Sequence, residues 1–220
     1  MQIGVLGSGQ VGETLANGFL KHGHSVIRGS RDARKLSSWA SHAGDAGSTG
    51  TFGEAASRAE VVVLAVKGTA AEDVVRTLGA STLAGKVVID ATNPIADEPP
   101  EGGVLRFFTG PNESLLERLQ SIASSARFVK CFSCVGNGLM VNPDFGDTKP
   151  TMFIAGDDAA AKQTVESLLD QFGWEYEDMG GAVAARAIEP LCVLWCIPGL
   201  LRNEWSHAFK LLKSQPRGVS

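Results

Sequence analysis

The sequence lacks the features that mark several large classes of protein. Its 20 Lys and Arg residues are outnumbered by 24 Asp and Glu residues, which gives a net charge of −4 at pH 7. Domains that bind nucleic acids usually carry a basic excess, so we expect no nucleic-acid partner. No apolar run approaches the roughly 18 residues of a membrane span, and residues 1–6 do not resemble a signal peptide. We therefore expect a cytoplasmic protein that has no membrane partner.

Cysteine and histidine are also scarce. The four cysteines form two close pairs, Cys131 with Cys134 and Cys192 with Cys196, and in a reducing compartment we expect free thiols. The first pair would suit a redox motif and the two pairs together a zinc site, but their apolar neighbours favour burial. The four histidines are scattered along the chain, and no Ser/His/Asp or paired-carboxylate pattern occurs. We therefore assign no catalytic residue and no metal site.

Short apolar runs alternate with helical patterns through most of the chain. The alternation is typical of an α/β fold, and it predicts a Rossmann-type doubly wound parallel sheet with a small, mainly helical C-terminal part. Strands are expected at residues 3–6, 25–28, 48–52, 60–67, 86–94 and 127–132, and helices at 10–22, 32–42, 70–78 and 112–125.

A long loop rich in turn-forming residues, 134–150, predicts a boundary between a domain at 1–150 and a small part at 151–220. In the second part we expect strands near 151–156 and 174–180, and a helix over 157–172 with Asp157 as its cap. Residues 181–213 form a strongly apolar helical pattern, which Pro190 and Pro198 should kink or divide. Within it, Arg186 and Glu189 each need a partner for their charge.

The stretch IGVLGSGQVG at residues 3–12 contains the pattern Gly7-x-Gly9-x-x-Gly12 where the first strand turns into the first helix. In this context the first glycine permits a tight turn, the second lets a diphosphate approach, and the third lets the helix pack on the strand. Unpaired backbone N–H groups at the helix start then face the phosphates. We predict that a dinucleotide binds here, at Gly7, Ser8, Gly9, Gln10, Val11 and Gly12.

The choice between NAD and NADP depends on the residues after the second strand, which read Arg28-Gly29-Ser30-Arg31-Asp32. A 2′-phosphate would be repelled by a carboxylate and bound by a guanidinium and a hydroxyl, so Ser30 and Arg31 favour NADP. Two other interpretations stay open: Arg31 is only a solvated surface charge, or Asp32 is the ribose-binding acid of an NAD enzyme and not a helix cap.

These residues carry a resemblance. The stretches IGVLGSGQVGETLANGFLKHGHSVIRGSRD, PTMFIAGDD and EPLCVLWCIPGLLRNEWSHAFKLL resemble the NADP oxidoreductases that use the deazaflavin coenzyme F420, and the reductase domain of the STEAP ferric reductases. The resemblance implies that Ser8, Ser30 and Arg31 bind the 2′-phosphate. It also implies an NADP-binding Rossmann domain at 1–150, a substrate-covering and dimerisation part at 151–220, and a homodimer. Two positions depart from the family: Ser133 stands where the archaeal enzyme has histidine, and Lys67 stands where proline is common.

Further candidates follow from the rule that nucleotide sites lie beyond the carboxyl ends of the strands. Ala65, Val66 and Lys67 should pass along the cofactor, and Thr92 and Asn93 should orient the nicotinamide amide or form a turn before Pro94. Ser133, Cys134 and Asn137 should face a second substrate. Gly136 and Gly138 leave room for a planar ring or form a turn, and Trp195 and Trp205 cover a ring system or pack in the core.

The predicted function is hydride transfer between NADP(H) and a flavin-type or deazaflavin acceptor such as F420. This chemistry requires close parallel placement of two rings in a dry pocket and no obligatory acid or base. Two alternatives stay open. One is reduction of a small imine or carbonyl compound, with Ser133 or Cys134 as proton donor, and the other is a non-catalytic NADP(H) redox sensor.

Overall fold

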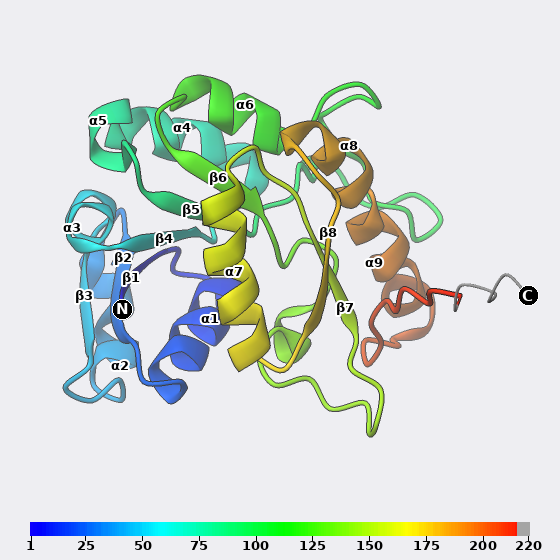
Figure 1. Cartoon of the computed structure of the whole chain (residues 1–220), viewed down its shortest axis with the longest axis horizontal. Coiled ribbons are helices and arrows are strands. Elements are labelled where there is room, and N and C mark those ends of the chain that lie inside the picture. Colours follow the sequence, from blue (N-terminus) through cyan, green and yellow to red (C-terminus); the bar gives the residue numbers. More distant parts are fainter. Residues whose placement is uncertain (215–220) are drawn as a thin grey trace, which may run out of the picture.

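The computed structural model describes residues 1–214 and contains a parallel sheet of six strands (Figure 1). Their order across the sheet is β3-β2-β1-β4-β5-β6, so the direction of winding reverses between β1 and β4. This confirms the predicted doubly wound α/β fold. The strands are β1 (Gln2–Leu6), β2 (Ser25–Ser30), β3 (Gly47–Thr51), β4 (Val61–Leu64), β5 (Val87–Asp90) and β6 (Arg127–Lys130).

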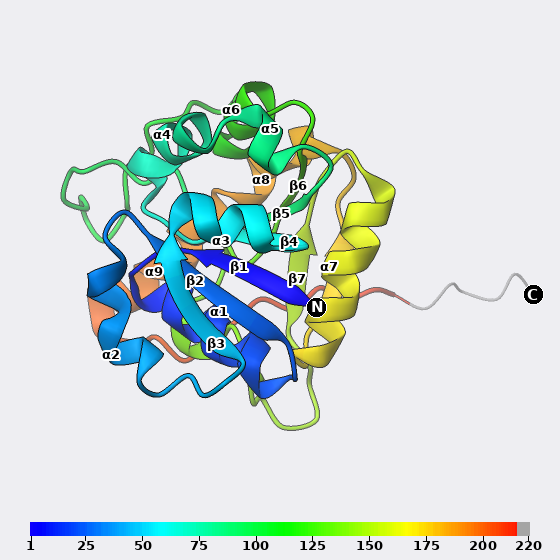
Figure 2. The same ribbon diagram turned by 90° about the vertical axis from the view of Figure 1, so that its left-hand side faces the viewer.

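Helices cover both faces of the sheet (Figure 2). One face carries α1 (Gln10–Lys21) and α7 (Ala159–Gln171), and the other carries α3 (Phe52–Arg58), α4 (Gly68–Leu78), α5 (Ala80–Leu83) and α6 (Leu115–Ile122). Successive strand residues point to opposite faces. Val5 therefore packs in the α1/α7 core and Leu6 in the α3–α6 core, and both side chains are fully buried.

A second, two-stranded parallel sheet follows the first. It consists of β7 (Thr151–Ile154) and β8 (Glu175–Asp178), the strands that flank α7 in the chain. Backbone hydrogen bonds between Lys130 and Ala155 join it to β6. The division of the chain at residue 150 stays a prediction.

The apolar C-terminal segment forms a 3₁₀ turn at Ala182–Ala184, then α8 (Ala185–Ile188) and α9 (Leu191–Arg202). Pro190 divides the two helices as predicted, whereas Pro198 lies inside α9 without ending it. Residues Ala182–Arg202 together are long and apolar enough to cross a membrane by length and composition, with a mean hydropathy of 1.5. The prediction that no apolar run approaches the length of a membrane span is therefore wrong, although the core helices of globular proteins can also be this long and apolar.

Several predicted helix boundaries are wrong. The helix expected at 112–125 is α6, which Ser114 caps, and α7 is capped by Asp158 in place of Asp157. The C-terminal helix ends at Arg202 and does not continue to residue 213, because Asn203 adopts the left-handed conformation that often terminates helices. The region 32–42 forms two short pieces, a 3₁₀ turn at Ala33–Leu36 and α2 (Ser37–Ala40). Helices α3 and α5 were not predicted, because both are short.

Candidate functional site

The glycine loop lies between β1 and α1, and its three glycines have different surroundings. A Cβ at Gly7 would collide with the carbonyl of Ala65, and one at Gly12 would stand 2.7 Å from the carbonyl oxygen of Gly7. A Cβ at Gly9 would meet nothing within 4 Å. The first and third glycines thus permit close packing, while the second leaves open space above the loop. This is the arrangement that a diphosphate requires.

A cleft of about 560 Å³ opens over this loop, at the edge of the sheet where the strand order reverses. Its lining includes eight residues predicted to bind the cofactor: Gly7, Ser8, Gly9, Ser30, Arg31, Ala65, Val66 and Lys67. Seven further residues line the same cleft: Asp32, Lys35, Phe52, Ala70, Asp73, Val74 and Thr77. The predicted residues Gln10, Val11, Gly12, Thr92 and Asn93 do not line it.

Gln10 and Val11 form the first turn of α1 beside the cleft. Gly9 is the N-cap residue, and no side chain caps this helix. The first backbone N–H groups of a helix have no partner within the helix, and the helix dipole places partial positive charge at the same end. The loop therefore presents hydrogen-bond donors to an anion without a competing side chain.

The rim of the cleft after β2 carries two cations. Arg31 and Lys35 are exposed, line the cleft, and form no ion pair with any residue in the range 1–214. Asp32 differs: its carboxylate accepts from the backbone N–H of Arg34 and lies 2.9 Å from the guanidinium Nε of that residue. These hydrogen bonds lower the pKa of Asp32. Asp32 is thus the helix cap that the NADP interpretation expected, and its carboxylate is already hydrogen-bonded to Arg34.

Ser30 is buried, and its hydroxyl belongs to the same turn. Its Oγ donates to the carbonyl oxygen of Asp32 at 2.5 Å and accepts from the N–H of Asp32 at 3.2 Å. The hydroxyl therefore fixes the shape of the loop that presents Arg31. Lys67, at the other side of the cleft, is exposed and forms an ion pair with Asp97 in the loop after β5.

Thr92 and Asn93 lie at the carboxyl end of β5. The hydroxyl and the N–H of Thr92 donate to Oδ1 of Asp90 at 2.6 and 2.9 Å, and Nδ2 of Asn93 donates to the carbonyl oxygen of Ser133 at 2.8 Å. Asn93 Oδ1 and Ser133 Oγ are buried and have no hydrogen-bond partner in the described part of the chain. The hydrogen bond brings the two predicted regions together, and these two orphan atoms are free to form further hydrogen bonds.

A buried ionic triad of Lys130, Asp90 and Glu189 contacts Thr92. Nζ of Lys130 lies 2.6 Å from Asp90 and 2.8 Å from Glu189, and it donates to the carbonyl oxygen of Thr92 at 3.0 Å. Burial alone would lower the pKa of Lys130, but the two carboxylates outweigh it and raise that pKa. Glu189 also accepts from the N–H groups of Leu115 and Leu116 at the start of α6. The carboxylate of Glu189 is thus paired with Lys130 and accepts hydrogen bonds from two backbone N–H groups.

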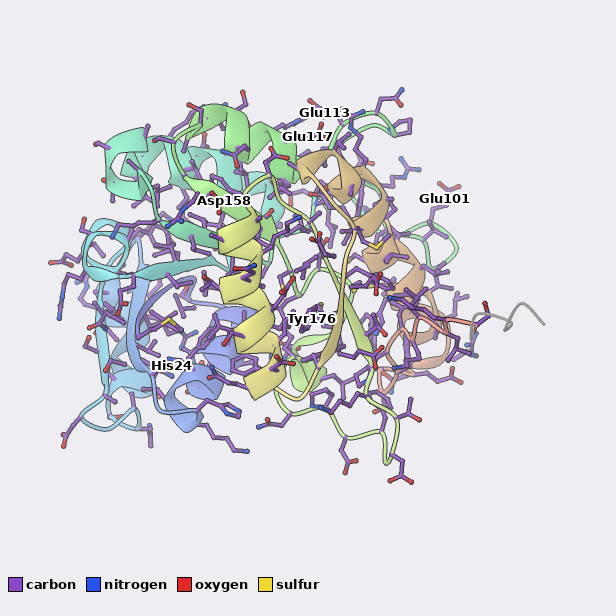
Figure 3. The ribbon with its side chains drawn as sticks, in the orientation of Figure 1. His24, Glu101, Glu113, Glu117, Asp158 and Tyr176 are labelled. Atoms are coloured by element: carbon purple, nitrogen blue, oxygen red, sulfur yellow. The ribbon has the colours of Figure 1, made fainter. Side chains whose placement is uncertain are left out.

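A second ion pair joins the C-terminal helices to α6. Figure 3 shows Glu113 and Glu117 together at the start of α6, beside α8. Glu117 forms a bidentate pair with Arg186 of α8, with a shortest separation of 2.6 Å. Both charges singled out in the apolar segment, Arg186 and Glu189, therefore have partners on the main sheet and its helices.

The predicted substrate residues follow β6, in a loop on which Trp195 of α9 packs. Ser133 and Cys134 are buried, and Asn137 begins a 3₁₀ turn (Asn137–Leu139). The indole ring of Trp195 packs directly on Gly136, so the space left by that glycine is filled by a side chain of the same protein. Trp195 is held by hydrogen bonds with His207, at 2.7 and 2.9 Å. The C-terminal segment thus packs on the loop that follows β6, where an acceptor is expected.

All four cysteines are free thiols, and they differ in environment. Burial raises the pKa of Cys134 to about 11 and that of Cys131 well above its usual value. The pKa of Cys192 is raised by its hydrogen bond with Cys196 and by burial, whereas the same hydrogen bond lowers the pKa of the half-buried Cys196. No group of three or more His, Cys, Asp or Glu residues within 1–214 has a metal-binding arrangement.

We expect one thiol per chain to react rapidly with iodoacetamide at pH 8. Alkylation requires an accessible thiolate, and Cys196 is the only cysteine in the described residues that combines partial exposure with a lowered pKa. Peptide mass spectrometry during a time course checks this, and Cys196→Ser should abolish the rapid phase. Rapid labelling of Cys131 or Cys134 in the folded protein would contradict the burial of that pair.

The residues missed by sequence reasoning fall into two groups. Lys35 could have been predicted from the sequence, because it is a second cation in the segment that follows Arg31. Phe52, Ala70, Asp73, Val74 and Thr77 carried none, because they reach the cleft only through the packing of α3 and α4 beside the glycine loop.

Comparison with known proteins agrees with this geometry. Residues 2–94 match the family described as NADP oxidoreductase, coenzyme F420-dependent. A solved structure from Arthrobacter sp. FB24, named as a candidate F420-dependent NADP reductase, is 28% identical with a TM-score of 0.87, and the match covers 96% of this chain and 98% of that one. A reductive aminase from Aspergillus terreus, solved in complex with NADPH4, cyclohexanone and allyl amine, shares the fold at 20% identity and a TM-score of 0.65, over 92% of this chain and 62% of that one.

Among curated proteins, metalloreductase STEAP3 of Rattus norvegicus is 30% identical over 206 residues, or 91% of this chain. The match covers 39% of that protein, so the chain spans about two fifths of the length of this relative. The resemblance seen in the sequence is confirmed by these matches. Residues 2–94 are thus similar to the coenzyme F420-dependent NADP oxidoreductases, and nearly the whole chain is similar to a solved candidate F420-dependent NADP reductase.

Proposed function

We propose that the cleft binds NADP(H) and that the protein transfers hydride between the nicotinamide and a deazaflavin or flavin-type acceptor. The observation that carries the cofactor assignment is the pairing of an open space above Gly9 with two cations, Arg31 and Lys35, that have no ion-pair partner in the described chain. A guanidinium and an ammonium at this position match a 2′-phosphate, while the engaged carboxylate of Asp32 offers little to a ribose hydroxyl.

Each part of the site has a defined task in this proposal. The N-terminal turn of α1 receives the diphosphate, Arg31 and Lys35 receive the 2′-phosphate, and Ser30 holds the loop that presents them. Thr92 and Asn93, fixed by Asp90 and Ser133, orient the nicotinamide end. Bound NADPH would supply the hydride. The cover formed by Trp195 and α9 excludes water from the acceptor side.

The acceptor assignment rests on two supports. The full-length likeness at 28% identity is to a candidate F420-dependent reductase. In addition, the two predicted proton donors are weak acids: Ser133 carries an aliphatic hydroxyl, and burial raises the pKa of the Cys134 thiol to about 11. Reduction of an imine or carbonyl compound needs a proton donor, whereas hydride transfer between nicotinamide and a flavin-like ring does not.

Turnover assays test this proposal directly. Purified protein is mixed with NADPH and, separately, with F420, FMN, FAD and a cyclic imine, and NADPH oxidation is followed by absorbance. We expect NADPH oxidation with a deazaflavin or flavin and none above background with the imine. Rapid turnover of the imine would favour the small-molecule reductase, and tight NADPH binding without turnover of any acceptor would favour the redox sensor.

We also propose that the protein forms a homodimer through its apolar C-terminal face. Among the described residues, eight of the ten exposed large apolar side chains lie between residues 179 and 212: Met179, Val183, Leu194, Leu200, Leu201, Trp205, Leu211 and Leu212. Apolar patches of this kind usually mark an interface. Light scattering should give the mass of two chains, and Leu194→Glu combined with Leu201→Glu should give one. A monomeric wild type would contradict the proposal.

A further inference from the structure

A charged side chain is buried in the middle of β2, where an apolar residue would be expected. Arg28 is only 1% exposed, and its strand neighbours Val26 and Ile27 are apolar and fully buried. Burial of a guanidinium is costly unless its N–H groups are all directed at acceptors. Arg28 therefore needs hydrogen-bond acceptors within the protein that offset the cost of burying its charge.

The guanidinium of Arg28 is directed at the glycine loop. Its Nε donates to the carbonyl oxygen of Gly7 at 3.1 Å, and its Nη2 donates to the carbonyl oxygen of Gly9 at 2.9 Å. Its Nη1 reaches the half-exposed carboxylate of Glu13 in α1 at 3.0 Å, and the ring of Trp39 lies 5.6 Å from its central carbon. The side chain is thus held by the loop, by α1 and by α2 at once.

These contacts determine where the donors of the loop point. In a trans peptide the carbonyl of one residue and the N–H of the next point in opposite directions, and the described chain contains no cis peptide. Because the carbonyls of Gly7 and Gly9 point towards Arg28, the N–H groups of Ser8 and Gln10 point away from it. Ser8 and Gly9 line the cleft, and the space beside Gly9 is open; Ser8 also lines a smaller cavity of about 200 Å³ beside Arg28.

We infer that Arg28 is a positioning residue, which orients the glycine loop so that its N–H groups receive the diphosphate of NADP(H). The inference rests on the proposed function, since it requires a dinucleotide in the cleft. It goes beyond that function by separating two arginines with different tasks. Arg31 recognises the 2′-phosphate, which only NADP(H) carries, whereas Arg28 acts through the loop on the diphosphate, which NADPH and NADH share.

Calorimetric titration with NADPH and with NADH tests this difference. In Arg28→Met, which keeps an unbranched apolar stem in the core, we expect the Kd for both nucleotides to rise by the same factor, about ten- to a hundredfold, as is usual when a binding group loses its support. In Arg28→Lys, which keeps the charge with fewer donors, we expect a smaller rise of the same kind. Thermal unfolding establishes that each variant is folded.

Glu13→Gln is the matched control, because it weakens the outer ion pair and leaves both loop hydrogen bonds of Arg28 in place. Its Kd values should stay within about twofold of wild type, because the glutamine oxygen can still accept from Nη1 and the loop hydrogen bonds are unchanged. A purely structural Arg28 would lower the thermal stability of the variants and leave the Kd of the folded protein unchanged, which would overturn the inference. A selective loss of NADPH binding would overturn it as well. Failure of the wild type to bind either nucleotide would instead overturn the proposed function.

Should Arg28→Met not fold, the Arg28→Lys variant and the wild type still decide the matter. NMR of the wild type should show a slowly exchanging Nε–H at Arg28, coupled across the hydrogen bond to the Gly7 carbonyl carbon. It should also show that the N–H signals of Ser8 and Gln10 shift most when NADPH or NADH is added. Rapid exchange of the Arg28 Nε–H, or undisturbed Ser8 and Gln10 signals in the bound state, would contradict the inference.

Discussion

Arg31→Ala is expected to raise the Kd for NADPH about ten- to a hundredfold and to leave the Kd for NADH within about twofold. Charge-assisted hydrogen bonds contribute about 1.5–3 kcal/mol each, and only NADPH carries the 2′-phosphate that Arg31 would bind. Arg31 is exposed and forms no ion pair within residues 1–214, so its removal leaves no buried charge unpaired. Calorimetry with both nucleotides measures the effect.

Arg34→Ala is the matched control for this experiment. Arg34 stands three residues further on, is also exposed, and its guanidinium pairs with Asp32 and does not line the cleft. We expect its NADPH affinity to change by less than about threefold, the scale of an exposed ion pair. Equal losses for NADPH and NADH in Arg31→Ala would show that Arg31 supports the loop in general and does not recognise the phosphate.

Lys130→Met is expected to reduce the free energy of unfolding by about 3–5 kcal/mol. Removal of one partner from a buried ion pair leaves uncompensated charge, and here two carboxylates, those of Asp90 and Glu189, would lose the same ammonium. For a chain of this size each kcal/mol corresponds to roughly 2–4 °C in Tm. Urea unfolding and thermal unfolding at neutral pH both measure the change.

The pKa shift of Lys130 sets the pH range of this contribution. Because the folded state raises that pKa, the stabilisation is complete below the ordinary lysine pKa and is lost only as pH rises through the higher folded value. Arg76→Met serves as the comparison, since Arg76 forms an exposed i,i+4 pair with Glu72 and its loss should cost less than about 1 kcal/mol. Similar losses for the two variants would contradict the importance of the buried triad.

The sequence predicted the central features of the fold because they depend on local patterns. The glycine loop, the first helix and the buried strand at Val61–Leu64 all follow from spacing and composition within a few residues, and the structure contains each of them. The short helix α3 was missed, although Thr51 and Glu54 form a capping box that the sequence displays. The end of α9 at Asn203 was missed because the apolar pattern continues beyond it.

The candidate site was predicted where it is formed by a single loop and missed where distant segments meet. Gly7, Ser8 and Gly9 line the cleft as expected, but Asp73 and Thr77 reach it only because α4 packs beside the loop. Likewise, the sequence showed that Glu189 needed a partner, and it gave no means of choosing Lys130. Contacts of this kind depend on the order of strands and not on spacing along the chain.

The most direct test of the account is a comparison of two small nucleotides that differ by one phosphate. Calorimetry measures the affinity of the wild-type protein for 2′,5′-ADP and for 5′-AMP. If Arg31 and Lys35 receive the 2′-phosphate, 2′,5′-ADP should bind at least about tenfold more tightly than 5′-AMP, with the advantage reduced by added salt. Equal affinities for the two nucleotides would contradict the assignment of the cleft to NADP(H).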